Sequence, residues 1–212
     1  MKETSDTLSV THLQCIRQQH IIFNSLSFEL HAGEVLFIEG PNGSGKSSLL
    51  RLLTGLSTPS LGDIRWCGKA IKTIYDDYTQ QFHYIAHTNG IKQGLTVAEN
   101  IQLTQHLSLT TSSLPLDLLT SLQLTNFQHT LVKQLSAGQQ RRVALAKLFL
   151  LSRKLWLLDE PLTALDTTTQ TFFLSQLETH LQQGGMAVMS SHQSDIFNSI
   201  NVNVKPLRLK SC

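Results

Sequence analysis

The chain of 212 residues is poor in charge: Asp, Glu, Lys and Arg make up 15% of it, against roughly 25% in an average soluble domain. Its 17 Lys and Arg nearly balance its 15 Asp and Glu, so the formal net charge is only +2. A near-neutral chain lacks the positive field of a polybasic protein, and we therefore expect no nucleic-acid partner. The shortage of charge also indicates that a partner covers part of the surface.

Cysteine and long apolar runs are scarce as well. Cys15, Cys67 and Cys212 are widely spaced with no C-x-x-C pair, which argues against a disulfide framework or a structural zinc site and fits a reducing compartment. No stretch of about 18 apolar residues occurs, so we expect no membrane-spanning helix. The first ten residues hold charges and no apolar run, which indicates no signal peptide.

The spacing of apolar residues predicts an α/β core interrupted by a helical insert. Apolar runs predict buried strands at residues 34–39, 155–158 and 186–190. Other short apolar patterns predict strands at residues 8–13, 26–30, 62–66 and 82–86. Helix-spaced apolar residues predict helices at residues 45–54, 95–107, 114–124 and 137–151. Asp166 is placed to cap a further helix, which Gly184 and Gly185 end.

A phosphate-binding loop follows the first buried strand. Its eight residues match the pattern G-x-x-x-x-G-K-[ST] and read Gly40, Pro41, Asn42, Gly43, Ser44, Gly45, Lys46 and Ser47. Glycines let successive backbone N–H groups turn toward a phosphate, and the N-terminus of the following helix adds positive potential. We expect Lys46 to neutralise the β- and γ-phosphates and Ser47 to bind Mg²⁺. A dinucleotide-binding loop fits poorly, because Ser48 stands where its third glycine would be.

Two carboxylates, Asp159 and Glu160, end the second buried strand. In open α/β sheets the carboxyl ends of the strands are where ligands bind. Asp159 is suited to hold Mg²⁺, directly or through water, and Glu160 could act as the general base that polarises the attacking water. An acidic pair that simply ends a strand is the alternative, and the neighbouring phosphate loop argues against it.

A second anion-binding helix end is predicted at residues 135–142. Ser136 is placed to cap this helix, and Gly138 with the bare N–H groups beside it would accept an anion. One chain does not need two phosphate-binding helix ends for one nucleotide, whereas two facing chains would complete each other's sites. An ordinary capped helix remains the alternative from the local pattern alone.

These three elements, in this order, resemble those of the ABC ATPases, with Ser-Ala-Gly-Gln in place of the commoner Ser-Gly-Gly-Gln. The resemblance implies an enzyme that hydrolyses ATP with Mg²⁺. It implies that Asp166 belongs to the D-loop and that His192 is the switch histidine that reaches the γ-phosphate. It places His87 at the Q-loop position, where most members have glutamine. Arg17 aligns with the usual adenine-stacking aromatic, and a guanidinium can also stack on a base.

The resemblance therefore implies a complete set of site residues. The nucleotide would be bound by Arg17, Gly40, Pro41, Asn42, Gly43, Ser44, Gly45, Lys46, Ser47 and Ser48. The metal would be bound by Ser47 and Asp159, and the catalytic residues would be Glu160 and His192. The signature that acts on the partner's nucleotide would be Leu135, Ser136, Ala137, Gly138 and Gln139.

Within the family, the chain is most similar to the ATP-binding subunits of the haem exporter of cytochrome c maturation. The narrower match is carried by residues 38–43, 48–51, 87–92, 135–146 and 155–161. It implies a homodimer, peripheral at the cytoplasmic face of the bacterial inner membrane and bound to integral membrane permease subunits. Haem would be handled indirectly, by the complex as a whole.

The expected fold is that of an ABC-type P-loop NTPase, formed by residues 1–212 as a single domain. A mixed or parallel core sheet and an N-terminal antiparallel part would occupy residues 1–88 and 152–212, with a helical subdomain at residues 89–151. Other functions stay open. A soluble ABC protein of translation or DNA repair usually has tandem domains or a coiled-coil insert, and a P-loop kinase would leave residues 135–142 unexplained. An ATP-binding subunit for a different cargo is a further alternative.

Overall fold

The computed structural model describes residues 6–107, 115–192 and 196–210. The chain forms two compact units. The first comprises Met1–Tyr84, Arg153–Glu160 and Glu178–Cys212, and the second comprises Ile85–Ser152 and Pro161–Leu177. Across the described ranges, no helix combines the length and apolar character that crossing a membrane requires.

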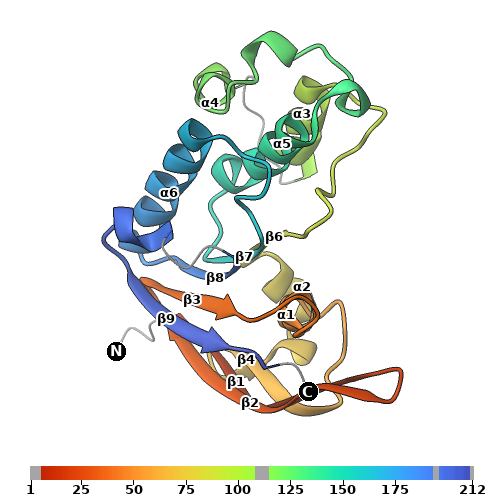
Figure 1. Ribbon diagram of the computed structural model, residues 1–212, viewed down its shortest axis with the longest axis vertical. Coiled ribbons are helices and arrows are strands. Elements are labelled where there is room, and N and C mark those ends of the chain that lie inside the picture. Colours follow the sequence, from red (N-terminus) through yellow and green to blue (C-terminus); the bar gives the residue numbers. More distant parts are fainter. Residues whose placement is uncertain (1–5, 108–114, 193–195, 211–212) are drawn as a thin grey trace. The chain divides into compact units, whose positions relative to one another are not determined.

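The first unit is built on two sheets (Figure 1). An antiparallel sheet has the strand order β2 (His20–His31), β1 (Thr7–Arg17), β4 (Leu61–Trp66) and β5 (Lys69–Ala70). The second sheet has the order β6 (Phe82–Ile85), β7 (Leu155–Asp159), β8 (Met186–Ser190), β3 (Glu34–Glu39) and β9 (Asn203–Arg208). The pairs β7–β8, β8–β3 and β3–β9 are parallel, so these four strands end at one edge of the sheet.

Helix α1 (Lys46–Leu53) packs against both sheets in one apolar core. The core contains the four buried leucines of α1, Leu49, Leu50, Leu52 and Leu53. Side chains of both sheets share it, among them Leu8, Val10, Leu36 and Ile38. Each fully buried leucine contributes about 1.5–3 kcal/mol to folding. The opposite face of β3 is buried too, since Phe37 makes an edge-on ring contact with Phe197 at 5.1 Å. Burial on both faces explains why residues 34–39 form an apolar run, and it fixes where the loop after β3 begins.

The remainder of the first unit contains short helices. They are α2 (Tyr75–Thr79) and the 3₁₀ turns η1 (Ile71–Thr73) and η4 (Ile196–Ser199). Tyr78 of α2 is fully buried, and its hydroxyl donates to the backbone oxygen of Leu53 at 2.7 Å, which fastens the C-terminal end of α1. Cys15 is buried, Cys67 is exposed and neither is in a disulfide, while Cys212 lies outside the described residues.

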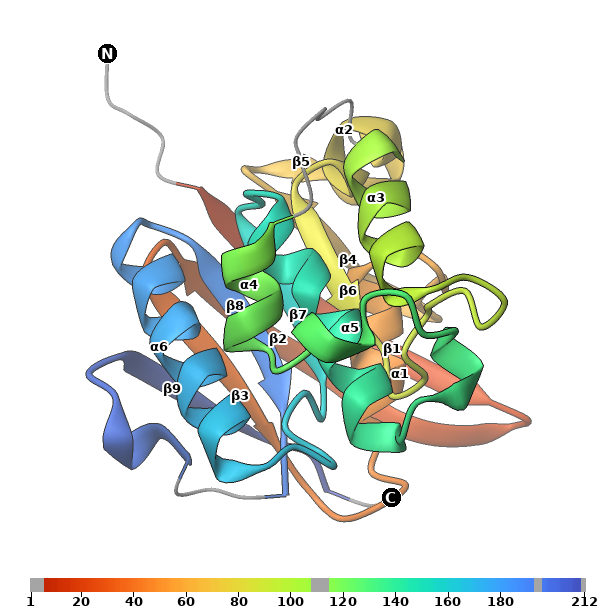
Figure 2. The same ribbon diagram turned by 90° about the horizontal axis from the view of Figure 1, so that it is seen from above.

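The second unit is helical (Figure 2). Its helices are α3 (Val97–Leu107), α4 (Leu116–Ser121), α5 (Ala137–Leu150) and most of α6 (Thr167–Gln182), with 3₁₀ turns η2 (Thr125–Phe127) and η3 (Val132–Gln134). One apolar core joins the first three helices, with Val97 and Ile101 from α3, Leu119 from α4, and Val143 and Ala146 from α5. The unit therefore holds α5 against two neighbouring helices.

Several elements differ from the sequence prediction, and three of them have a clear physical reason. Strand β2 is longer than residues 26–30, because it pairs with β1 along nearly its whole length. The helix predicted at residues 114–124 is limited to α4, since the chain turns at Gln123, whose φ of 54° is left-handed. Strand β9 was not predicted at all. It is a polar edge strand that contains Pro206, and neither property gives a sequence signal for a strand.

A stacked pair of rings joins the C-terminal turn of α6 to the parallel sheet. His180 lies flat on Trp156 of β7, with ring centroids 4.1 Å apart, and its Nε2 contacts the backbone oxygen of Met186 at 3.1 Å. A Cβ atom on Gly185 would clash with the His180 ring. Burial lowers the pKa of His180 from 6.5 to about 4, so its imidazole is neutral at pH 7.

This burial predicts a pH dependence of stability. The unfolded chain protonates His180 near pH 6.5, whereas the folded chain does so only near pH 4. The unfolded state therefore binds more protons between these values, and the free energy of unfolding should fall as the pH drops, by up to about 3 kcal/mol. Urea unfolding of the wild type and of His180→Phe, which keeps a ring on Trp156, at pH 7 and pH 5 measures this. The same pH dependence in both proteins would contradict the prediction.

Candidate functional site

The phosphate loop joins β3 to α1 in the first unit. Gly40, Gly43 and Gly45 have positive φ of 152°, 83° and 98°, a conformation that favours glycine. A Cβ atom on Gly40 would lie 2.6 Å from both the Leu209 backbone oxygen and the Ser44 hydroxyl. A Cβ atom on Gly45 would lie 2.4 Å from the side chain of Ile22 on β2. The backbone can follow this path only because these positions carry no side chain.

Lys46 is held inside the loop. Its side chain is nearly buried, and Nζ donates to the backbone oxygens of Gly40 at 2.8 Å and Pro41 at 3.2 Å. The hydroxyl of Ser44 is buried and has no hydrogen-bond partner among the described residues. The loop thus holds a buried ammonium and a buried hydroxyl that has no partner among the described residues, and both groups can donate to phosphate oxygens.

The carboxylates at the end of β7 are organised by the neighbouring strand β8. Asp159 and Ser190 are register partners, and the Ser190 hydroxyl donates to Asp159 Oδ1 at 2.8 Å. The same hydroxyl lies 3.1 Å from the backbone N of Glu160, which donates to it. Glu160 has a left-handed φ of 49°, and its Oε1 lies 2.9 Å from Nε2 of His192. The pair of strands therefore fixes both carboxylates and brings the histidine onto one of them.

One cavity unites the phosphate loop with Glu160. It has a volume of about 200 Å³ and is lined by Ile22, Asn42, Gly43, Gly45, Lys46, Ser47, Ser48 and Glu160. The loop lysine and hydroxyls thus share one space with a carboxylate from a strand more than a hundred residues further along the chain. A phosphate chain held by the loop would be within the reach of a general base.

Arg17 lies outside this cavity. It is exposed at the tip of the β1–β2 hairpin, where it pairs with His20 across a turn formed by Gln18 and Gln19. Both turn residues have positive φ. The side chain of this hairpin that lines the cavity is Ile22. Of the predicted nucleotide-binding residues, Arg17 is therefore not brought onto the loop.

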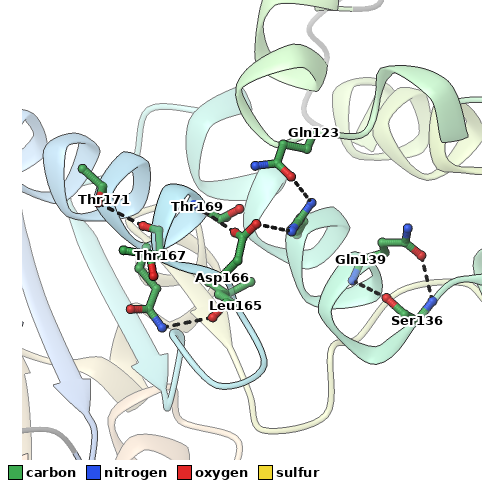
Figure 3. Close-up of polar contacts among 10 residues, drawn as sticks. Gln123, Ser136, Gln139, Leu165, Asp166, Thr167, Thr169 and Thr171 are labelled. Carbon is green, nitrogen blue, oxygen red and sulfur yellow. Dashed lines mark hydrogen bonds and ion pairs between the residues drawn. The ribbon is translucent and has the colours of Figure 1, made fainter.

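The predicted signature residues lie in the second unit, at the start of α5. Ser136 caps this helix with a reciprocal pair of hydrogen bonds (Figure 3): Gln139 N donates to Ser136 Oγ at 3.2 Å, and Ser136 N donates to Gln139 Oε1 at 2.9 Å. Leu135 is buried under the helix start, whereas Ser136 and Ala137 are exposed. The predicted cap is confirmed, and it leaves this helix end open to solvent.

The segment that contains Asp166 packs on the same helix. A Cβ atom on Gly138 would lie 2.5 Å from the Ala164 backbone oxygen, so glycine is required there. One helical turn later, Arg142 donates to Asp166 Oδ2 at 3.0 Å (Figure 3). Asp166 Oδ1 also accepts from Thr169 N at 3.0 Å, which confirms the predicted cap of α6, and hydrogen bonds from Thr169 lower the pKa of Asp166. Asp166 is thus fastened to α5.

His87 is exposed, and it lies in a segment that accepts hydrogen bonds from side chains of α5. The buried guanidinium of Arg141 donates to the backbone oxygen of Ala86 at 2.8 Å and to Asn89 Oδ1 at 3.0 Å. Lys147 Nζ donates to the backbone oxygen of Gly90 at 2.8 Å, and burial lowers the pKa of this lysine. Residues 86–90 therefore have a fixed path along α5.

The sequence places this chain among known proteins. Residues 23–163 match the family described as ABC transporter. The chain belongs to the ABC transporter family. ABC transporter ATP-binding proteins hydrolyse ATP, so the predicted enzyme class and the predicted P-loop fold are confirmed.

Similar proteins narrow the position within the ABC transporter family. Two are named cytochrome c biogenesis ATP-binding export protein CcmA. The protein from Nitrosomonas europaea is 42% identical over 93% of this chain and 94% of its own length, and that from Vibrio cholerae is 41% identical over 95% and 98%. A solved structure titled "Structure of ATP binding subunit of ABC transporter" shares the fold, with a TM-score of 0.83 at 24% identity over 95% of this chain and 87% of that chain. The chain is therefore a CcmA-like ATP-binding protein.

Two residues that position the predicted site groups, Ser190 and Arg142, cannot be identified from the sequence. Ser190 ends an apolar run in the sequence, but only the structure shows that this run ends beside Asp159. Arg142 belongs to the motif at residues 135–142, but its partner Asp166 lies 24 residues away, so the motif does not indicate this contact. Register between strands and contacts across a helix are not visible in one sequence.

Ser190 gives a prediction for the ATPase reaction. Ser190→Ala removes the donor to the buried Asp159 carboxylate, which costs about 1–3 kcal/mol. We expect kcat for ATP hydrolysis to fall about tenfold, with a smaller change in KM. Steady-state kinetics measure this, with Ser199→Ala, at an exposed position, as the control. An unchanged kcat in a folded Ser190→Ala protein would contradict a role of Ser190 in positioning the Asp159 carboxylate.

Proposed function

We propose that this chain is the ATP-hydrolysing subunit of the haem exporter of cytochrome c maturation. The ATPase part is carried by one observation: Lys46 and Glu160 line the same cavity of about 200 Å³. The haem part is supported by the relatives, which are named cytochrome c biogenesis export proteins and match this chain over nearly its whole length.

We assign a role to each predicted site residue of the first unit. Residues 40–48 would surround the phosphates, with Lys46 opposite the β- and γ-phosphates. Ser47 and Asp159 would hold Mg²⁺, since hydroxyl and carboxylate oxygens are its preferred protein ligands. When bound, the ion neutralises charge on the β- and γ-phosphates.

Glu160 is the proposed general base. It accepts a proton from the attacking water while the water oxygen bonds to the γ-phosphorus and the bond to the β–γ bridging oxygen breaks. His192, 2.9 Å from this carboxylate, would hold it in place and would reach the γ-phosphate. The left-handed backbone at Glu160 and its hydrogen bond to Ser190 fix the direction from which the base acts.

Arg17 and His87 complete the proposed set. Arg17 stands on the hairpin that also carries Ile22, a residue of the cavity wall, so adenine stacking requires its long side chain to fold back over the nucleotide. His87 is proposed at the Q-loop position, in the segment that Arg141 holds on α5. ATP affinity of Arg17→Ala, compared with Lys46→Ala, separates base stacking from phosphate binding.

We also propose that two copies form the working ATPase. The exposed start of α5, at Ser136 and Ala137, would bind the γ-phosphate of the partner copy. A substitution at Gly138 tests this poorly, because any side chain there collides with Ala164 of the same chain. Ser136→Asp is the sharper change, since aspartate also caps a helix while it adds a negative charge, and Ser136→Asn is its neutral match.

If Ser136 acts on the nucleotide of the partner copy, a negative charge at this position should prevent dimer formation and leave ATP binding by the monomer unchanged. In a Glu160→Gln background, ATP should drive dimer formation, which sedimentation velocity measures. Adding Ser136→Asp should abolish the dimer, whereas Ser136→Asn should keep it. ATP affinity of the monomer should be the same in both. Equal dimerisation of the two variants, or a loss of monomer affinity in Ser136→Asp only, would contradict action in trans.

The proposed partners are integral membrane permease subunits, at the cytoplasmic face of the bacterial inner membrane. The chain itself would be peripheral there, and haem would be bound by the complex and not by this subunit. No nucleic-acid partner is proposed, in keeping with the net charge of +2. Co-purification of the assembled complex, with its membrane subunits and cargo identified, tests this placement.

The haem function gives a test in cells. A strain whose sole copy carries Glu160→Gln should lose most covalently haemylated c-type cytochrome, because ATP turnover should fall by about 10²–10⁴-fold. Haem staining of membrane proteins measures this, and a strain with wild-type protein at equal abundance is the control. Normal haemylation would exclude the haem exporter and favour a different transported cargo.

A further inference from the structure

The C-terminal strand β9 reaches the phosphate loop from the edge of the sheet. Leu209, directly after β9, donates its N–H to the backbone oxygen of Glu39 at 2.8 Å. Its own backbone oxygen covers Gly40, where a Cβ atom would lie 2.6 Å from it. Leu209 is buried in the same core as α1. The first residue of the loop is therefore enclosed by the backbone of Leu209.

An acid lies at this junction. Glu39 precedes Gly40 directly, and both line a cavity of about 340 Å³ together with Phe37, Ser191, His192 and Arg208. The guanidinium of Arg208 meets the Glu39 carboxylate, with Nε 2.8 Å from Oε2. His192, which contacts Glu160, faces the same cavity. A carboxylate is thus placed beside a loop that has to accept the negative charges of nucleotide phosphates.

Such a carboxylate repels a polyphosphate unless a cation neutralises it. We propose that Arg208 is a positioning residue for nucleotide binding: its guanidinium neutralises Glu39 and holds it away from the phosphate loop. The inference rests on the proposed phosphate site at residues 40–48. It explains why an exposed edge strand ends in an arginine at this point, opposite its register partner Glu39.

The chain supplies a matched control at the other end of the same two strands. Lys205 Nζ lies 2.7 Å from Glu34 Oε2, so β9 is joined to β3 by a second ion pair. This pair stands at the amino end of β3, away from Gly40. If the ion pairs serve only to attach β9 to β3, removal of either pair should weaken nucleotide binding to the same extent.

The test is a set of single and double variants of the full chain, whose affinities for β,γ-methylene-ATP, ADP and AMP are measured at low and high salt. Arg208→Ala should weaken β,γ-methylene-ATP binding by about 3- to 10-fold at low salt, less for ADP and least for AMP. Glu39→Gln should not weaken binding, and the double variant should return near the wild-type affinity. Arg208→Lys should retain most of the affinity.

Two further measurements distinguish neutralisation of Glu39 from attachment of β9 to β3. In ATP hydrolysis, Arg208→Ala should raise KM while kcat at saturating ATP stays within about twofold, and the affinity difference should shrink at high salt. Lys205→Ala and Glu34→Gln should leave nucleotide affinity within about twofold of the wild type.

Several outcomes would overturn the proposal. Equal weakening by Arg208→Ala and Glu39→Gln would show attachment of β9 only, as would equal weakening by Lys205→Ala. Affinity unchanged in Arg208→Ala would remove any role for this residue. Lys46→Ala serves as the separate reference: if it too leaves nucleotide affinity unchanged, the proposed phosphate site itself has failed, and not just the inference about Arg208.

Discussion

The turn of the chain at Gly40 is the constraint on which the site depends. Strand β3 ends there under the backbone of Leu209 and beside the side chain of Ser44, with no room for a Cβ atom. Because β3 is buried on both faces and α1 is packed into the core, neither end of the loop can move to relieve a larger residue. The backbone path of the loop is therefore fixed by packing.

The same edge of the sheet gathers groups from distant parts of the sequence. Parallel strands β3, β7 and β8 bring the loop, the carboxylate pair and the Ser190–His192 segment together, and β9 adds Arg208. In the second unit, α5 performs a similar task, since its residues fasten the Asp166 segment, the segment after β6 and its own cap. In the first unit the edge of the parallel sheet, and in the second unit α5, thus bring predicted site residues together.

Much of the site could be predicted because its signals are local. The loop at residues 40–47, the acidic pair after an apolar run and the cap at Ser136 each depend on neighbouring residues. The structure brings loop residues and Glu160 onto one cavity and forms the capping box at Ser136. What the sequence could not predict depends on distant pairing. Strand β9 forms because β3 offers it a hydrogen-bonding edge, and its own composition of polar residues and Pro206 does not favour a strand. Ser190 and Arg208 acquire their partners only through sheet register.

The central claim is that one cavity binds the phosphates through Lys46 and contains the base Glu160. Its most direct test is the pair of measurements, ATP affinity and ATP turnover, on Lys46→Ala and Glu160→Gln. Lys46→Ala should bind ATP at least tenfold more weakly, since a buried counter-charge is lost. Glu160→Gln should bind ATP as tightly as the wild type, yet hydrolyse it about 10²–10⁴-fold more slowly. Wild-type turnover in Glu160→Gln, or wild-type affinity in Lys46→Ala, would contradict the account.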